Sequence, residues 1–386
     1  MLYLRKRRLC VFWALLAVVL STNTARAESA RFIERQINGA SLAYVNEVPV
    51  LSLQGTPKDM GRQLASLAGP AAERLIDYPR EAFGGPSGET GWKRLLKASR
   101  ALWPNIPNDH REELATVARL SGIDRDALLA GNVMMDVYRG MNCSSLMVEP
   151  ARSATEGPLF GRNLDFFGRG YLHKYTLVTV YRPRGKHAFA SVGFAGLFGC
   201  LTGMNDQGLT LAIHEVIASR DGSRLFNPEG VPYGFALRRI MEECSTVDEA
   251  EKLIRSIKRT TMYNIGLCDK NKAVVLEVTP KNVVRRKAVA GLCPCTNHFR
   301  TAELAVFPFC SRFTALTTDV PKKLTVDDVI KHMHAANMGR LTLHTAVFEP
   351  AELRMHLAFG RLPASAGPYH KLDLKPLFKA KVIKPE

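Results

Sequence analysis

The chain has 386 residues, of which 46% are apolar, and a formal net charge of +17. A chain of this size can bury a large core, and no Pro- or Gly-rich linker divides it into separate modules. Its basic residues are spread over expected loops and strand edges and form no aromatic-interleaved stripe, so we expect no nucleic-acid partner. They are expected to form a solvated surface that attracts anionic substrates or makes peripheral contact with an anionic membrane.

Residues 1–27 have the pattern of a secretory signal peptide. Arg5 to Arg8 form a basic region, Leu9 to Leu20 an apolar one, and Ala25-Arg26-Ala27 a small-residue cleavage site. The apolar run is too short to cross a bilayer comfortably, which disfavours a retained membrane anchor. Removal of this segment takes away five basic and no acidic residues and lowers the net charge from +17 to +12. The sequence therefore predicts a secreted or periplasmic protein.

The region from 57 to 140 is predicted to be helical because apolar residues recur there at three- and four-residue spacing. The expected helices are Asp59–Leu75, Gly91–Leu102, Asp109–Leu120 and Asp124–Tyr138. Asp109 followed by Glu112 resembles a capping box, and Gly122 is a plausible helix stop before Asp124 starts the next helix.

After Cys143 the sequence changes to short β runs interrupted by helices. The expected strands are Ser145–Val148, Leu159–Asp165, Thr176–Tyr181, Ala188–Val192, Leu209–His214, Asn264–Cys268, Ala273–Thr279, Val283–Val289 and Leu292–Thr296, with a final hairpin of Leu341–Phe348 and Leu353–Phe359. The expected helices are Tyr233–Cys244, Val247–Ile257 and Val326–Ala335. Groups of strands separated by a pair of helices favour an α+β architecture, with antiparallel sheets faced by helices.

The cysteines other than Cys143 are open to several interpretations. An oxidising compartment would permit disulfides among Cys200, Cys244, Cys268, Cys293, Cys295 and Cys310, but the sequence does not say which form. Cys293, Cys295 and Cys310 fit no standard zinc spacing, so structural thiols or a disulfide are favoured and no metal is expected.

Cys143 begins an apolar strand, and Arg162 and Asp165 follow on the next expected strand. A fixed positive charge near a thiol favours the thiolate, which is the nucleophilic form. Arg162 and Asp165 are three residues apart, so a regular strand would place them on opposite faces. Both can face Cys143 only if the strand twists, bulges or ends there; otherwise one of them is structural.

Five ordered motifs give the chain a family resemblance. They are Asn142-Cys143-Ser144-Ser145, Gly161 to Phe166, Gly193-Phe194-Ala195-Gly196 with Leu201 to Asn205, Thr296 to Phe299, and Ser311-Arg312-Phe313. Over roughly residues 115–360 the chain is similar to the N-terminal-nucleophile (Ntn) hydrolases, and within them to the acid ceramidase, penicillin acyltransferase and choloylglycine hydrolase group.

The resemblance implies a four-layer αββα sandwich, with a helical N-terminal segment like the family's propeptide. It also implies self-cleavage between Asn142 and Cys143, into fragments 28–142 and 143–386 that remain associated as alpha and beta chains. The freed α-amine of Cys143 would then take the proton of its own thiol, so no histidine base is needed.

The resemblance also implies roles for single residues. Asp165 would orient that amine, Asn297 would donate its amide to the oxyanion, and Arg312 would be a second arginine near the nucleophile. His214 and Glu215 depart from the pattern, since relatives often have an asparagine there. They remain candidates for an oxyanion or substrate contact.

Each of these residues also has a structural interpretation. Cys143 alone would usually be a small buried hydrophobe. Arg162 and Asp165 can form a structural ion pair, Asn297 can be a turn residue, and Arg312 can belong to an unrelated ion pair.

The sequence predicts an autoprocessing cysteine amidohydrolase that cleaves linear N-acyl amides through a Cys143 acyl-enzyme, without cofactor or metal. Phe166, Phe167, Tyr171, Phe194, Leu197 and Phe198 are candidates for an apolar acyl pocket, or for plain core packing. The alternatives are an acyltransferase of the penicillin acyltransferase type and a non-catalytic secreted binding protein on the same fold. A papain-like protease is disfavoured because that fold needs a helix after the cysteine, where this chain has β runs.

Overall fold

A computed structural model describes residues 32–85, 89–307 and 309–379. The predicted signal peptide, residues 1–27, lies outside the described residues, and so does the C-terminal end from residue 380. Among the described residues, no helix has both the length and the apolar character needed to cross a membrane.

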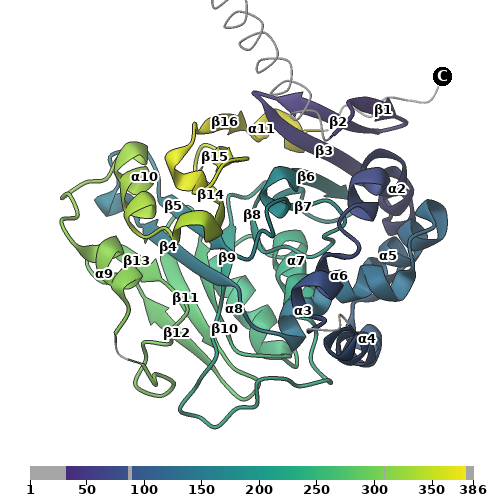
Figure 1. Cartoon of the computed structure of the whole chain (residues 1–386). Coiled ribbons are helices and arrows are strands. Elements are labelled where there is room, and N and C mark those ends of the chain that lie inside the picture. The colour runs from purple at the N-terminus through teal and green to yellow at the C-terminus, as the bar shows by residue number, and fades with distance from the viewer. Residues whose placement is uncertain (1–31, 86–88, 308, 380–386) are drawn as a thin grey trace, which may run out of the picture. The chain divides into compact units, whose positions relative to one another are not determined.

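Two β-sheets form the centre of the fold from Glu34 onward (Figure 1). The larger sheet has the strand order β1-β2-β3-β6-β7-β8-β9-β10-β11-β12. Its strands are β1 (Arg35–Ile37), β2 (Ala40–Val45), β3 (Val48–Gly55), β6 (Thr176–Pro183), β7 (Phe189–Phe194), β8 (Thr202–Asn205), β9 (Thr210–Glu215), β10 (Tyr263–Cys268), β11 (Ala273–Val278) and β12 (Val283–Lys287).

The smaller sheet has the order β13-β4-β5-β14-β15-β16. Its strands are β13 (Leu292–Cys295), β4 (Asn142–Val148), β5 (Leu159–Asp165), β14 (Thr342–Glu349), β15 (Arg354–Phe359) and β16 (His370–Asp373). The predicted hairpin near the C-terminus is confirmed, because β14 and β15 pair antiparallel over six residues each.

The two sheets pack face to face across one apolar core. Val178, Val192 and Val275 of the larger sheet belong to the same buried cluster as Phe160 and Phe348 of the smaller one. Alternate residues of each strand point into this layer, since successive side chains of a strand alternate between its faces. On β4 and β5, every second residue therefore faces this layer, and Cys143 is one of these inward-facing residues.

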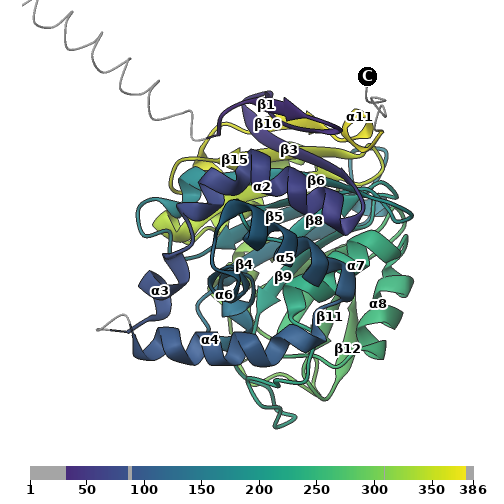
Figure 2. The same ribbon diagram turned by 90° about the vertical axis from the view of Figure 1, so that its right-hand side faces the viewer.

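Helices cover the outer faces of both sheets. On the larger sheet α2 (Pro57–Glu73), α7 (Tyr233–Glu243) and α8 (Val247–Ser256) contact the strands, and α5 (Asn108–Ser121) and α6 (Arg125–Val137) pack on α2 and α7. On the smaller sheet α9 (Ser311–Thr317) and α10 (Val326–Ala335) do so. Figure 1 shows these two helix groups on opposite sides of the strands, and in Figure 2 helices α2, α5 and α6 lie in front of them. The predicted αββα sandwich is therefore confirmed.

The remaining elements are short or peripheral. They are α3 (Tyr78–Phe83), α4 (Thr90–Leu102) and α11 (Lys375–Phe378), and the 3-10 helices η1 (Trp103–Asn105), η2 (Pro150–Arg152), η3 (Leu172–Tyr175), η4 (Gly339–Leu341) and η5 (Ala364–Ala366).

Two of the three predicted helix signals are confirmed. Gly122 ends α5 with a left-handed φ of 75°, and the Asp124 side chain accepts the N–H of Ala127 at the start of α6. The predicted capping box at Asp109 is wrong. Helix α5 begins at Asn108, and its N-cap Pro107 has no side chain that can accept a hydrogen bond. The described capping boxes are Thr56 with Asp59 and Thr325 with Asp328.

The N-terminal segment is not wholly helical, which corrects the prediction. Strands β1, β2 and β3 precede its helices, and β3 pairs in parallel with β6. Residues on either side of the Asn142–Cys143 bond thus share one sheet. All seven cysteines within the described residues are free and buried. Among the residues that the structure describes, no group of three or more His, Cys, Asp or Glu side chains could hold a metal ion.

Candidate active site

Cys143 is the second residue of β4 and is completely buried. It pairs with Leu164 of β5, and Ser145 pairs with Arg162, so these four side chains share the inner face of the smaller sheet. Arg162 extends toward the larger sheet, where its Nε donates to the Thr202 hydroxyl over 3.2 Å. The arginine is also completely buried, and its charge acts directly on the Cys143 thiol.

Asp165 lies at the end of β5, across from Asn142. The Thr342 hydroxyl donates to its Oδ1 over 2.6 Å, and its Oδ2 lies 3.7 Å from the Arg312 guanidinium. As the three-residue spacing predicts, Arg162 and Asp165 lie on opposite faces of β5. Both still reach the site. Arg162 shares the inner face with the thiol, and Asp165 lies at the end of the strand, beside the peptide bond that precedes Cys143.

Asn297 follows β13 and binds the chain on both sides of the Asn142–Cys143 bond. Its Oδ1 accepts the backbone N–H of Cys143 at 2.8 Å. Its Nδ2 donates to the carbonyl of Met141 at 3.2 Å and to the carbonyl of Glu215 at 2.8 Å. Asn297 is therefore fixed at the junction and is more than a turn residue.

Arg312 completes this arrangement from helix α9, which the sequence analysis does not predict. Its Nη1 donates to the carbonyl of Cys143 over 2.6 Å, and its Nη2 donates to Oδ1 of Asn297 over 2.9 Å. Nη2 also lies 3.5 Å from Oδ1 of Asn142. The structure thus brings together all five residues predicted to be catalytic, and Asn142 with them.

Burial controls the titration of this site. Removal from water raises the pKa of the Cys143 thiol to about 11, although Arg162 and Arg312 act in the opposite direction. The expectation that Arg162 favours the thiolate is right in direction, but burial outweighs it and the thiol is neutral in the uncleaved chain. Burial also raises the pKa of Asp165 to about 6 against the effects of Thr342, Arg312 and Arg162.

His214 and Glu215 end strand β9 and contact the same region. Nε2 of His214 lies 2.8 Å from the Ser145 hydroxyl, and burial lowers the pKa of this imidazole well below its ordinary value. Glu215 accepts the backbone N–H groups of Gly140 and Met141 at 3.1 and 3.2 Å. Burial raises its pKa to about 7. Glu215 therefore holds the segment before the Asn142–Cys143 bond, while His214 links the two sheets.

Asn264 of β10 is a positioning residue that the sequence analysis missed. Its Nδ2 donates to the carbonyls of Thr296 and His298 at 2.9 and 3.0 Å, and its side chain is completely buried. These bonds hold the backbone on both sides of Asn297. Nothing in the local sequence marks Asn264, because its partners lie more than thirty residues further along the chain.

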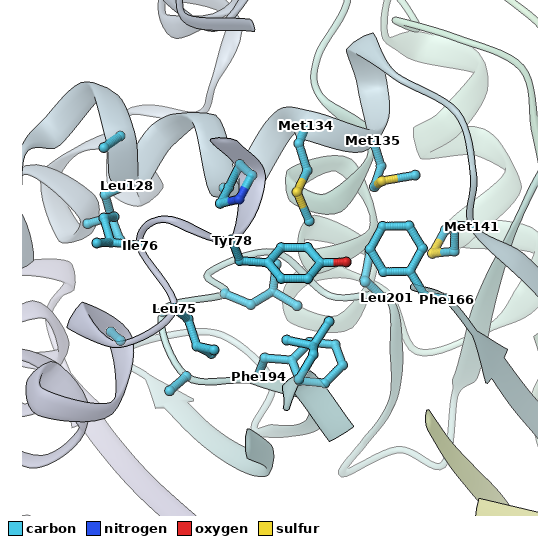
Figure 3. Close-up of a pocket in the computed structure, with 18 of the residues that line it drawn as sticks. Leu75, Ile76, Tyr78, Leu128, Met134, Met135, Met141, Phe166, Phe194 and Leu201 are labelled. Carbon is cyan, nitrogen blue, oxygen red and sulfur yellow. The ribbon is translucent and has the colours of Figure 1, made fainter. Parts of the chain in front are cut away.

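An apolar pocket lies beside the site (Figure 3). Met141, two residues before Cys143, and Leu164, the partner of Cys143 across the sheet, form part of the pocket wall. Its empty volume, opening included, is about 710 Å³. The lining side chains include Leu75, Ile76, Tyr78, Leu128, Met134, Met135, Phe166, Phe194, Leu197 and Leu201.

The predicted pocket residues divide into two groups. Phe166, Phe194 and Leu197 line the pocket. The other three do not: Phe198 is buried core, Phe167 is half exposed, and Tyr171 donates its hydroxyl to Glu81. Met134 and Met135 line the pocket from α6. The contribution of the N-terminal segment could not be predicted from the sequence, because helical periodicity shows that a helix has a buried face but not what that face contacts.

One family model matches residues 152–362, more than half of the chain, and it describes acyl-coenzyme A:6-aminopenicillanic acid acyl-transferase. The matched range includes Arg162, Asp165, Asn297 and Arg312 and begins after Cys143. Among curated proteins, protein dcd1A of Dictyostelium discoideum is 28% identical over 173 residues. This match covers 42% of the chain and 37% of the relative's length.

Several solved structures are also similar. An N-acylethanolamine-hydrolyzing acid amidase ortholog of Caenorhabditis elegans has a TM-score of 0.42 and 16% identity, covering 54% of this chain and 93% of that one. A variant of conjugated bile acid hydrolase from Clostridium perfringens has 0.45 and 14%, covering 62% and 95%. Penicillin V acylase from Agrobacterium tumefaciens has 0.42 and 13%, covering 60% and 92%.

The family match confirms the resemblance to the penicillin acyltransferase group of the Ntn hydrolases. The chain belongs to the acyl-coenzyme A:6-aminopenicillanic acid acyl-transferase family.

Proposed function

We propose that this protein is an exported, autoprocessing cysteine amidohydrolase that cleaves linear N-acyl amides. The observation that carries the proposal is the arrangement of Asn297 and Arg312 around the Asn142–Cys143 peptide bond. A buried thiol in a polar cluster centred on its own peptide bond is suited to attack that bond first and a substrate amide later.

Maturation would proceed by two balanced steps. The Cys143 sulfur bonds to the carbonyl carbon of Asn142, the carbon–nitrogen bond breaks, and the thiol proton passes to the departing nitrogen. Water then hydrolyses the thioester and leaves a carboxyl group on Asn142 and a free thiol on Cys143. The Glu215 contacts to Gly140 and Met141 support this step, because they fix the segment that must not move during attack.

In turnover the freed α-amine of Cys143 would accept the thiol proton and return it to the leaving amine. Asn297 would donate its amide to the oxyanion, since cleavage releases the Met141 carbonyl that this amide binds in the uncleaved chain. Arg162 would stabilise negative charge on sulfur. Asp165, whose pKa of about 6 allows it to exchange protons near neutrality, would orient the amine.

The apolar pocket supports an aliphatic or aromatic acyl group. Apart from the Tyr78 hydroxyl, which is bonded to the carbonyl of Phe167 at 2.5 Å, its side chains are apolar. Burial of a hydrocarbon chain there contributes about 0.8 kcal/mol per methylene group. N-acyl compounds with apolar acyl chains are therefore the proposed substrates, and water is the proposed acceptor.

The two fragments would stay associated after cleavage. Strand β3 pairs with β6 across the boundary, and buried Glu113 of α5 forms an ion pair of 2.6 Å with buried Arg238 of α7. Both fragments also line the pocket. Their separation would break the β3–β6 pairing and expose the apolar core that Val50 and Val178 share, which is costly.

Acyl transfer is the second candidate, and the family's description favours it. The same acyl-enzyme would pass its acyl group to an amine in place of water. The experiment that tests the proposal is incubation of purified wild type and Cys143→Ala with N-acyl amides. Release of carboxylic acid by the wild type alone supports hydrolysis, and product that forms only when an acceptor amine is added supports transfer. Equal activity of Cys143→Ala would overturn both.

A further inference from the structure

Gly131 is an unusual residue for its position. It lies in the middle of helix α6 (Arg125–Val137), where glycine lowers helix stability relative to alanine because the unfolded chain has more freedom to lose. It is half-buried and lines the apolar pocket. Its place in the helix can therefore be compared with the space around it.

Packing does not explain it. A Cβ atom built on Gly131 would have as its nearest neighbour Cγ of Pro79, at an ordinary contact distance of 3.7 Å. At two other helical glycines the backbone leaves no such room: a Cβ on Gly61 would lie 2.8 Å from the carbonyl oxygen of Glu113, and one on Gly91 would lie 1.8 Å from that of Phe83. The missing side chain at Gly131 therefore keeps space open in the pocket.

The position of Gly131 along the pocket matters. Leu128, Gly131 and Met135 are spaced three and four residues apart, so they follow one face of α6. With a rise of 1.5 Å per residue, Gly131 lies about 4.5 Å along the axis from Leu128 and about 6 Å from Met135. In Figure 3, Leu128 lies at one end of the pocket, and Met141, which is near Cys143 in sequence, lies at the other.

We propose that Gly131 determines the length of the acyl chain that the pocket accepts, and that the substrates are amides of long acyl chains. This inference rests on the proposed function for its catalytic readout. The reason is geometric: a chain that enters the pocket at the Met141 end, two residues from Cys143 in sequence, passes Met135 before it reaches Gly131. A large side chain there would close the stretch between Gly131 and Leu128.

The test compares Gly131→Ala and Gly131→Leu with the wild type on N-acyl glycines from hexanoyl to stearoyl. For the wild type, kcat/KM should rise about fourfold with each methylene group that leaves water, until the pocket is full. For Gly131→Leu the rise should end about three methylene groups earlier, so that its long-chain to short-chain ratio falls about sixtyfold. Gly131→Ala should show a smaller shift in the same direction.

Gly69→Ala is the matched control. Gly69 lies in helix α2, a Cβ there would meet Cβ of Ser121 at 3.7 Å, and it does not line the pocket. This variant makes the same gain in helix propensity and should keep the wild-type chain-length profile. Gly131→Leu that cleaves short chains normally and has the wild-type profile for long ones would overturn the inference.

A binding experiment separates this inference from the proposed function. If the wild type cleaves no N-acyl amide, the proposed function fails, but the pocket can still be measured with free fatty acids by calorimetry. Tight binding of palmitate by the wild type and loss of that binding in Gly131→Leu, with hexanoate unaffected, would support the inference. Equal palmitate binding by both proteins, or none by either, would overturn it.

Discussion

The side chain of Asn297 accepts the backbone N–H of Cys143 at 2.8 Å. Its amide nitrogen meanwhile donates to the carbonyl of Met141 at 3.2 Å, on the other side of the bond that would be cut. One side chain therefore forms hydrogen bonds on both sides of the Asn142–Cys143 bond. After cleavage, Asn297 and Cys143 would belong to the same fragment, whereas Met141 would belong to the other one. Met141 could then move away, and the amide nitrogen of Asn297 would be available to a substrate.

Asn297→Asp should separate these two contacts. The carboxylate keeps an oxygen for the N–H of Cys143 and for Arg312, but it has no donor for an oxyanion. Loss of one such donor typically lowers the rate about 10²–10³-fold. We expect acyl-amide turnover of the matured protein to slow by a factor of this size, measured by acid release. Rates within about threefold of the wild type would contradict the role of Asn297.

Arg162→Gln should make the thiol of Cys143 less acidic. Burial already raises the pKa of this thiol to about 11, and Arg162 gives the largest opposing effect. Without that charge the pKa should rise further, and alkylation of Cys143 by iodoacetamide should be slower at every pH below it. Peptide mass mapping distinguishes Cys143 from the other thiols. Arg162→Lys, which keeps the charge, should lie closer to the wild type, and equal rates in all three proteins would exclude an electrostatic effect.

Glu113→Gln should weaken the contact between the two parts of the chain. The carboxylate of Glu113 pairs with Arg238 at 2.6 Å, and both side chains are almost completely buried. Removal of one partner from such a pair typically costs about 3–5 kcal/mol. Urea unfolding of uncleaved Cys143→Ala protein, with and without Glu113→Gln, measures this cost.

The neighbouring Glu112 is exposed and provides the control. Glu112→Gln should leave the free energy of unfolding within about 0.5 kcal/mol of its parent, as is usual for surface substitutions. Similar values for the two variants would show that the buried pair contributes little.

Asp136 should make the protein less stable as the pH rises. Burial raises its pKa from 3.8 to about 7, against hydrogen bonds from Thr260 and Tyr233. The folded state therefore favours the protonated form, so the contribution of Asp136 is fully present below pH 3.8 and is lost as the pH rises through about 7. Each unit of pKa shift corresponds to about 1.4 kcal/mol.

Asp136→Asn should remove this dependence, because the amide oxygen can still accept both hydrogen bonds and carries no charge. The difference in free energy of unfolding between variant and wild type should grow in favour of the variant from acid to neutral pH. Urea titrations at several pH values measure it. A difference that is constant with pH would show that Asp136 stays ionised or neutral throughout.

Much of the fold could be predicted from local sequence patterns. Strand β5 and helix α10 have the predicted bounds, because an alternating or helical apolar pattern ends at clear boundaries there. Strands β1 to β3 were missed for a physical reason. Strand β3 is stabilised by pairing with β6, more than a hundred residues away, and local sequence contains no trace of that partner.

The site followed the same division. Asn142, Cys143, Asp165, Asn297 and Arg312 were predicted from motif order, and the structure brings them together. Asn264 and the wall of the pocket formed by α6 were not predicted, because each depends on which elements pack together. The titration of Cys143 was only half predicted, since charge can be read from sequence but burial cannot.

Intact mass of the purified wild type under denaturing conditions tests the central claim most directly. We expect two polypeptides, the larger with 244 residues and Cys143 at its N-terminus, and a single chain for Cys143→Ala. A folded wild type that gives one uncut mass, identical in pattern to Cys143→Ala, would contradict it.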